Sequence, residues 1–185
     1  MTAIVGLTHN GSVYIGADSA TESNGMVHVS AVPKVFTLNA LVIGTTGSIR
    51  YRQIIQRHVS GLRSLTDGEH ILRYLVVEFV PLLRNALKEH GFTKSEAGQE
   101  SADYGAMLIG CKGELLRIDC DFSVLKFDRP FDAIGSGSTL ALGAMAALSP
   151  RLAPERRIRR ALEIVTEFDP YVRPPFVIRS PGELV

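Results

Sequence analysis

The sequence predicts an α+β fold, in which strands and helices occupy separate blocks of the chain. Alternating apolar runs typical of strands fill residues 3–44 and 104–135, whereas apolar residues at helical spacing fill 49–90 and 139–168. Because the blocks are segregated, layered α+β packing is favoured over an alternating βαβ fold. The chain has 185 residues, 45% of them hydrophobic, and no repeat or low-complexity linker, so we expect one domain covering residues 1–185.

A hairpin opens the first strand block. Residues 3–7 and 13–17 form two alternating runs, and the Asn10-Gly11 dipeptide between them is typical of a tight β-hairpin turn. Antiparallel partners bring the start of one strand opposite the end of the other. We therefore expect Thr2 and Asp18 to be spatial neighbours.

Short strands and a turn of small residues follow the hairpin. The polar residues 19–25 predict a surface loop, and the apolar runs that follow predict strands at 26–29, 35–38 and 41–44. Residues 45–48, Thr-Thr-Gly-Ser, precede a helical pattern. Free backbone N–H groups in such a turn are suited to hold an anion or a developing oxyanion.

The middle and end of the chain predict two pairs of helices around a second strand block. Helices are expected at 49–62 and at 67–90, the second bent at Pro81, before an exposed, mobile connection at 93–101. The later elements are strands at 104–111, 114–120, 123–127 and 131–135, helices at 139–148 and 154–168, and an edge strand at 174–178.

Composition excludes several classes of function. Lys+Arg 20 against Asp+Glu 19 leaves a net charge of +1, which is not the footprint of a nucleic-acid-binding protein. No apolar run is long enough to span a membrane and no signal-peptide pattern is present. Cys111, Cys120 and the five histidines show no metal-ligand spacing. We expect a cytoplasmic protein without a metal or other cofactor.

Thr2 directly follows the initiator Met1. Removal of Met before a small residue is the ordinary expectation, and it would free the α-amino group of Thr2. That amine can act as the base for the hydroxyl of its own residue, so no distant histidine is needed. An unperturbed α-amino group has a pKa of about 7.7–8.0, close to working pH.

The order and spacing of five motifs resemble the proteasome-type N-terminal nucleophile (Ntn) hydrolases, in particular bacterial HslV-type β-subunits and related short proteasome-like proteins. The motifs are Thr2, Gly16-Ala17-Asp18, Lys34, Thr46-Gly47 and Ile134-Gly135-Ser136-Gly137. The resemblance covers nearly the whole chain. It implies a four-layer αββα sandwich of two antiparallel sheets flanked by helices.

The resemblance also implies roles for individual residues. Thr2 matches the nucleophile, and Lys34 matches a cation that lowers the proton affinity of the Thr2 hydroxyl and amine. Asp18 matches the carboxylate that orients this lysine. The Gly47 amide matches the oxyanion donor, a contribution of roughly 3 kcal/mol to transition-state stabilisation. Ser136 matches the serine that relays the proton of the amine.

An acidic residue on the final helix completes the pattern in the family. Glu167 is the predicted acid, but Asp169-Pro170 follows it, with proline where the family has a serine or a small polar residue. Thr45 and Thr46 are the predicted substrate-binding residues, and Thr45 would make the specificity pocket less apolar than Met or Phe would.

The implied function is a threonine-type peptide hydrolase in a homo-oligomeric ring that encloses the active sites. Its substrates would be peptides or unfolded proteins, delivered by an ATPase unfoldase. Two alternatives remain open: a catalytically silent protein of the same fold with a structural role, favoured by Met1 and Pro170, and a small-molecule amidase. Nucleotide binding at residues 135–137 is disfavoured, because the Lys-Ser/Thr of a phosphate-binding loop is missing.

Overall fold

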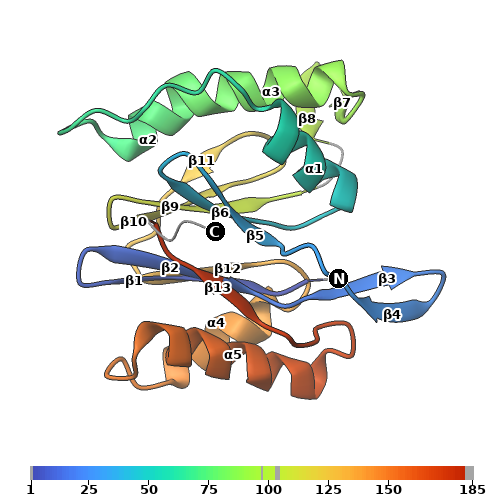
Figure 1. Ribbon diagram of the computed structural model, residues 1–185, viewed down its shortest axis with the longest axis vertical. Coiled ribbons are helices and arrows are strands. Elements are labelled where there is room, and N and C mark those ends of the chain that lie inside the picture. The colour runs from blue at the N-terminus through green and yellow to red at the C-terminus, as the bar shows by residue number, and fades with distance from the viewer. Residues whose placement is uncertain (1, 97, 103–104, 182–185) are drawn as a thin grey trace.

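Two antiparallel β-sheets lie face to face in the computed structural model, which describes residues 2–96, 98–102 and 105–181 (Figure 1). The first sheet contains, in spatial order, β12 (Phe131–Ile134), β1 (Ile4–His9), β2 (Ser12–Ala17) and β13 (Val177–Arg179). The second contains β11 (Val124–Leu125), β10 (Glu114–Ile118), β9 (Met107–Cys111), β6 (Leu41–Thr45) and β5 (Val35–Leu38).

Helices form the two outer layers. The second sheet is covered by α1 (Ile49–His58), α2 (Ile71–Tyr74), the π-helical turn η1 (Leu75–Phe79) and α3 (Val80–Glu89). The first sheet is covered by α4 (Ser138–Ala147) and α5 (Pro154–Phe168) (Figure 1). The α+β class and the four-layer αββα sandwich are therefore confirmed.

The opening hairpin forms as its turn residues dictate. Asn10 and Gly11 have φ values of 48° and 75°, the left-handed conformation that a two-residue hairpin turn requires. The resulting register pairs Ile4 with Ala17, and the Asp18 amide donates to the Ala3 carbonyl at 3.2 Å. The start of β1 thus lies beside the end of β2, as the sequence predicted.

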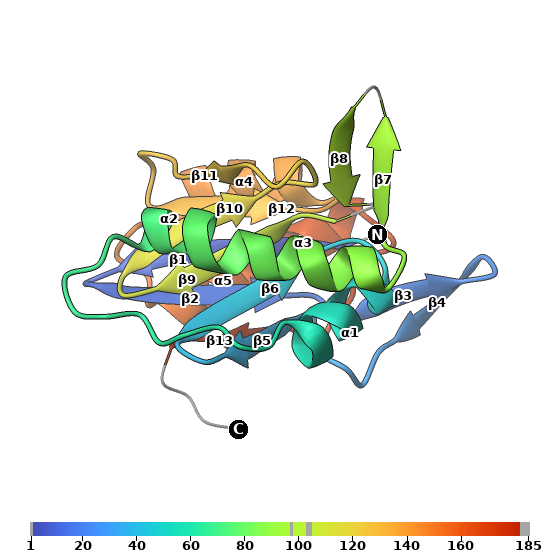
Figure 2. The same cartoon turned by 90° about the horizontal axis from the view of Figure 1, so that it is seen from above.

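Two segments predicted as irregular are hairpins instead. Residues 19–25 contain β3 (Ala20–Ser23), which pairs with β4 (Met26–Val29). The described part of 93–101 belongs to the pair β7 (Thr93–Glu96) and β8 (Gln99–Ala102). Both hairpins project from the sandwich (Figure 2). A projecting strand packs few side chains on a core, so the apolar alternation that signals a strand is weak in both segments.

Helix lengths also differ from the prediction. The helix predicted at 49–62 ends at His58, although Val59 and Leu62 are buried; their apolar spacing reflects core packing beyond the helix. The helix predicted at 67–90 starts at Ile71 and contains η1 just before Pro81. Proline lacks the N–H for the bond to the preceding turn, and a π-helical turn accommodates that gap.

Most other strands match their predicted ranges with shifted ends. The strand predicted at 104–111 begins at Met107, and position 104 lies outside the described residues. None of the helices in the described ranges is both long and apolar enough to cross a membrane.

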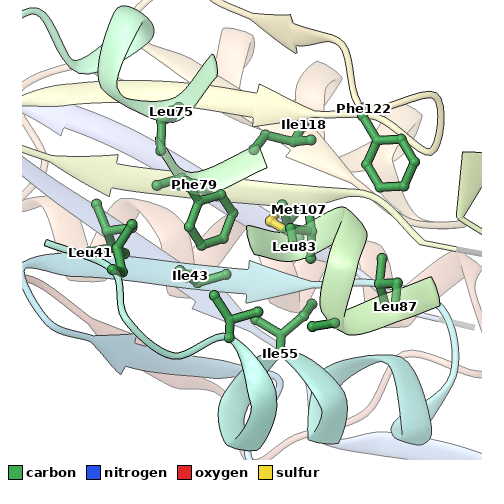
Figure 3. Packing of buried hydrophobic residues seen from close by; sticks show 14 of the residues in the cluster. Leu41, Ile43, Ile55, Leu75, Phe79, Leu83, Leu87, Met107, Ile118 and Phe122 are labelled. Carbon is green, nitrogen blue, oxygen red and sulfur yellow. The ribbon is translucent and has the colours of Figure 1, made fainter. Parts of the chain in front are cut away.

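Buried apolar residues fill all three interfaces between the layers. Between the helices and the second sheet, Phe79 and Leu83 face Ile43 and Met107 (Figure 3). Between the sheets, the cluster is Ile4, Val13, Ile15, Ala17, Val35, Val42, Leu108, Leu115 and Ile134. Between the first sheet and its helices, it is Ala3, Val5, Leu7, Ala133, Ala141, Ala144, Met145, Ile158, Ala161, Leu162, Val165 and Val172.

Glycines bring the two sheets close together. A Cβ atom at Gly6, Gly44 or Gly110 would come within 2.5–2.7 Å of a side chain of the opposite sheet. Real Cβ atoms do not approach so closely, so these positions have no room for a larger residue.

Gly110→Ala should lower the free energy of unfolding by about 1–3 kcal/mol, because the added methyl meets Val13 Cγ1 at 2.5 Å. The matched control is Gly143→Ala in α4, where no atom lies within 4 Å of the added carbon. The control should be up to about 1 kcal/mol more stable, since Ala favours helix over Gly. Urea denaturation measures the free energy of unfolding of both variants. Equal unfolding midpoints for Gly110→Ala and Gly143→Ala would contradict close packing of the sheets.

Candidate active site

Thr2, Lys34 and Asp18 meet where the two sheets come together. Thr2 precedes β1, Asp18 follows β2 and Lys34 precedes β5. Lys34 Nζ lies 2.9 Å from Thr2 Oγ1 and 2.9 Å from Asp18 Oδ1. All three residues are buried, with Thr2 only 6% exposed. The hairpin and the strand after it therefore bring a hydroxyl, an ammonium and a carboxylate into direct contact.

Backbone amides fix the Asp18 carboxylate. Its Oδ1 accepts from the Ala3 amide at 3.0 Å, and its Oδ2 accepts from the Ala20 amide at 2.9 Å. Charge-assisted bonds of this kind are stronger than neutral ones. The carboxylate cannot rotate away without losing them, so it holds the Lys34 ammonium against Thr2.

Burial lowers the pKa of Lys34 from its ordinary value, because desolvation disfavours the charged form. The charge and hydrogen bond of Asp18 oppose this shift, whereas the nearby positive charge of Arg52 adds to it. A more acidic ammonium is a stronger hydrogen-bond donor to a hydroxyl that is losing its proton. The lysine is thus suited to stabilise negative charge on Thr2 Oγ1.

The other side of Thr2 contacts the segment after β12. The Thr2 nitrogen lies 3.1 Å from Ser136 Oγ, and Ser136 Oγ lies 3.4 Å from Asp169 Oδ2. The Tyr171 amide donates to Asp169 Oδ1 at 2.9 Å, which orients this carboxylate. The Thr2 N–H, the Ser136 hydroxyl and the Asp169 carboxylate form a hydrogen-bonded chain. Met1 lies outside the described residues.

The carboxylate that contacts Ser136 in the structure belongs to Asp169, whereas the sequence predicted Glu167 as the acid. Glu167 is exposed on the last turn of α5. The helix ends at Phe168, and the extended backbone of Asp169 turns its side chain back toward Ser136. The Asp169-Pro170 dipeptide was the available signal, because helices usually end at or before the residue that precedes a proline.

The Gly135-Ser136-Gly137 turn holds the Thr2 backbone. The Gly137 amide donates to the Thr2 carbonyl at 3.2 Å. Gly135 has φ +96°, and a side chain there would collide with the same carbonyl oxygen. The turn therefore contacts Thr2 directly and fixes its position.

The turn between β6 and α1 carries the predicted oxyanion donor and substrate residues. Thr46 is tied to the segment before β9, since its Oγ1 accepts from the Ala106 amide at 3.0 Å and its own amide donates to the Ala106 carbonyl at 2.9 Å. The Gly47 amide forms no hydrogen bond with another described residue. It is available to a ligand beside Thr2.

Two cavities open on either side of Thr2 and Gly47. The larger, about 840 Å³, is also lined by Thr46 and Ser136 and extends to the base of the β7–β8 hairpin. The smaller, about 280 Å³, is lined by Thr45, the predicted pocket residue. Its wall includes Arg52, which sequence reasoning missed because it reads as an ordinary residue of a surface helix.

The described ranges contain no group of three or more His, Cys, Asp and Glu residues arranged to hold a metal ion. Cys111 is buried and Cys120 exposed, and both are free thiols.

The chain is similar to known proteins in sequence and in fold. No protein-family model matches the sequence. An ATP-dependent protease subunit HslV from Cytophaga hutchinsonii is 27% identical over 185 residues, which cover 97% of this chain and 95% of the relative.

Solved structures share the fold. BPH from Thiobacillus denitrificans, in complex with epoxomicin, has a TM-score of 0.78 at 24% sequence identity. The match covers 96% of this chain and 97% of the BPH chain. Eukaryotic HslV from Trypanosoma brucei has a TM-score of 0.68 at 21% identity, covering 96% and 98%. The resemblance to proteasome-type Ntn hydrolases, and to HslV-like proteins among them, is confirmed.

Asp18→Asn should lower the pKa of Lys34 further, because it removes the negative charge that favours the protonated amine. The midpoint can be followed by titration of the Lys34 ¹³Cε chemical shift. Asp132→Asn is the matched control, since Asp132 is also buried but pairs with Arg117 and Arg129. It should leave the Lys34 midpoint unchanged. An unchanged titration midpoint of Lys34 in Asp18→Asn would contradict an electrostatic interaction between Asp18 and Lys34.

Proposed function

We propose that this chain, which has the fold of proteasome-type Ntn hydrolases, is a threonine-type amide and peptide hydrolase. Thr2 is the nucleophile once Met1 has been removed. The observation that carries this proposal is the position of Lys34 Nζ, 2.9 Å from both Thr2 Oγ1 and Asp18 Oδ1. A buried ammonium held against a hydroxyl by a fixed carboxylate is an arrangement that activates a nucleophile.

Met1 removal supplies the base. While Met1 is attached, the Thr2 nitrogen is an amide, whose lone pair is delocalised into the carbonyl and does not accept a proton. After removal, the nitrogen is an amine that takes the proton of Thr2 Oγ1 as this oxygen attacks the substrate carbonyl. Lys34 stabilises the charge that develops on Oγ1.

The reaction proceeds through an ester on Thr2. Attack gives a tetrahedral intermediate, and its oxyanion accepts a hydrogen bond from the Gly47 amide. When the intermediate collapses, the α-ammonium group gives its proton to the leaving amine and an acyl ester of Thr2 remains. The same amine then activates water, which hydrolyses the ester. Ser136 and Asp169 hold the amine and relay its proton.

We further propose that copies of this chain assemble into a ring enclosing the active sites, with an ATPase supplying unfolded protein. The relative from C. hutchinsonii, an ATP-dependent protease subunit, supports this extension. A second support is the projecting β3–β4 hairpin, where Met26 is 60% exposed and Val29 58% exposed. Exposed apolar clusters of this kind are commonly covered by a protein partner.

Thr2→Ala should reduce peptide hydrolysis by about 10⁴-fold or more, because it removes the attacking oxygen. Native mass spectrometry should show the same assembly as the unaltered protein. Intact mass after incubation with epoxomicin provides the second readout: a protein without Met1 should gain the mass of the inhibitor, and Thr2→Ala should not. Turnover in Thr2→Ala, or by protein that retains Met1, would contradict the assignment.

Asp169→Asn should lower kcat by about 10- to 100-fold, because the Ser136 hydroxyl loses its carboxylate partner. Glu167→Gln is the matched control, two residues away on the exposed surface, and should stay within about two-fold of the unaltered protein. The pH profile of kcat should change only for Asp169→Asn. The reverse pattern would return the role to Glu167.

A further inference from the structure

Two residues that line the smaller cavity beside Thr2 each carry a buried polar side-chain atom that has no hydrogen-bond partner among the described residues. These atoms are Arg52 Nε and Thr45 Oγ1. Arg52 is only 5% exposed and Thr45 only 3% exposed. Buried polar groups are normally satisfied, since an unpaired one costs free energy of folding. Because both residues line one cavity, we infer a ligand in it that supplies acceptor atoms.

Arg52 supplies the positive charge of this cavity, because Lys34, the other basic residue in its wall, is paired with Asp18. Arg52 makes no ion pair or side-chain hydrogen bond with any described residue. Lys34 also lines the cavity, and the positive charge of Arg52 contributes to lowering the pKa of Lys34. The acidic residue in the wall is Glu22, which is exposed and whose Oε1 accepts from the Gly25 amide at 2.6 Å. A bound anion would complement the buried guanidinium.

The cavity lies where one substrate side chain must go. Thr2 and Gly47, the proposed nucleophile and oxyanion donor, both line it. The attacked carbonyl would lie between these two groups, so the side chain of the same residue, one carbon away, reaches a cavity adjoining both. The small cavity of about 280 Å³ suits a single side chain, and the larger cavity of about 840 Å³ suits the rest of the peptide.

We propose that this cavity binds the acidic side chain, Asp or Glu, of the residue whose carbonyl Thr2 attacks, with Arg52 and Thr45 Oγ1 donating to its carboxylate. This proposal rests on the hydrolase function proposed above and makes cleavage follow acidic residues. Arginine is the side chain best suited to a carboxylate, because its donors match the two oxygens. An apolar side chain would leave Arg52 unpaired, and a basic one would meet a like charge.

A panel of fluorogenic peptides tests the selectivity. The peptides are identical except for the residue before the reporter, which is Glu, Gln, Leu or Lys. With protein lacking Met1, kcat/KM for Glu should exceed that for Gln by about 10- to 100-fold, the value of hydrogen bonds to a charged group. Equal values for Glu and Gln, or a preference for Leu, would overturn the proposal.

Variants of α1 assign the preference to Arg52. Arg52→Gln should abolish the advantage of Glu over Gln, and Arg52→Lys should keep part of it, since the charge remains. Arg50→Gln is the matched control, because Arg50 is exposed on the same helix and its Nη2 donates to the His90 carbonyl at 3.1 Å. It should keep the full preference. A Glu advantage that survives in folded Arg52→Gln would overturn the role of Arg52.

A binding measurement separates this proposal from the proposed function. The Arg52 ¹⁵Nε resonance of Thr2→Ala is titrated with acetyl-Ala-Ala-Glu-methylamide and with the corresponding Gln peptide. Only the Glu peptide should shift the resonance, and no shift would overturn the proposal. If the Glu peptide shifts the resonance of Thr2→Ala but the protein lacking Met1 hydrolyses no peptide, the carboxylate-binding cavity is supported and the proposed hydrolase function is overturned. If the protein lacking Met1 hydrolyses peptides without preference for Glu, the hydrolase function is supported and the carboxylate-binding cavity is overturned.

Discussion

The contact of Lys34 with Thr2 and Asp18 joins the two sheets at the site. Thr2 and Asp18 flank β1 and β2 of one sheet, and Lys34 precedes β5 of the other. Burying two charges costs desolvation energy, so the pair is stable only with good geometry and further hydrogen bonds. The backbone amides of Ala3 and Ala20 supply those bonds to the carboxylate. Loss of one partner from such a pair typically costs about 3–5 kcal/mol.

The remaining groups reach Thr2 from the ends of other elements. The turn after β12 holds the Thr2 carbonyl and nitrogen, the end of α5 brings Asp169 to Ser136, and the turn after β6 brings Gly47 to the cavities. Each group lies on a turn whose ends are fixed by packed strands or helices. The packing of the flanking elements therefore fixes the position of each group around Thr2.

Local sequence signals were sufficient for the parts of the site that depend on strand register. The Asn10-Gly11 turn set the register of β1 and β2, which was enough to bring Thr2 beside Asp18. Local sequence signals were insufficient where the role of a residue depends on the direction of its side chain. Glu167 and Asp169 are two residues apart, and only the end of α5 decides which carboxylate faces Ser136. Arg52 reads as a surface residue until α1 packs on the second sheet and buries it.

The glycine-lined contact between the sheets links the core to the chemistry. Gly44 adjoins the pocket residue Thr45, and a Cβ atom at Gly44 would meet Ile4 at 2.7 Å and Ile15 at 3.0 Å. Ile4 follows Thr2 by two residues on β1. The spacing of the sheets therefore sets the separation between the Thr2 hydroxyl and the amine of Lys34. A single methyl group added at Gly44 would therefore act on the proposed reaction through that distance.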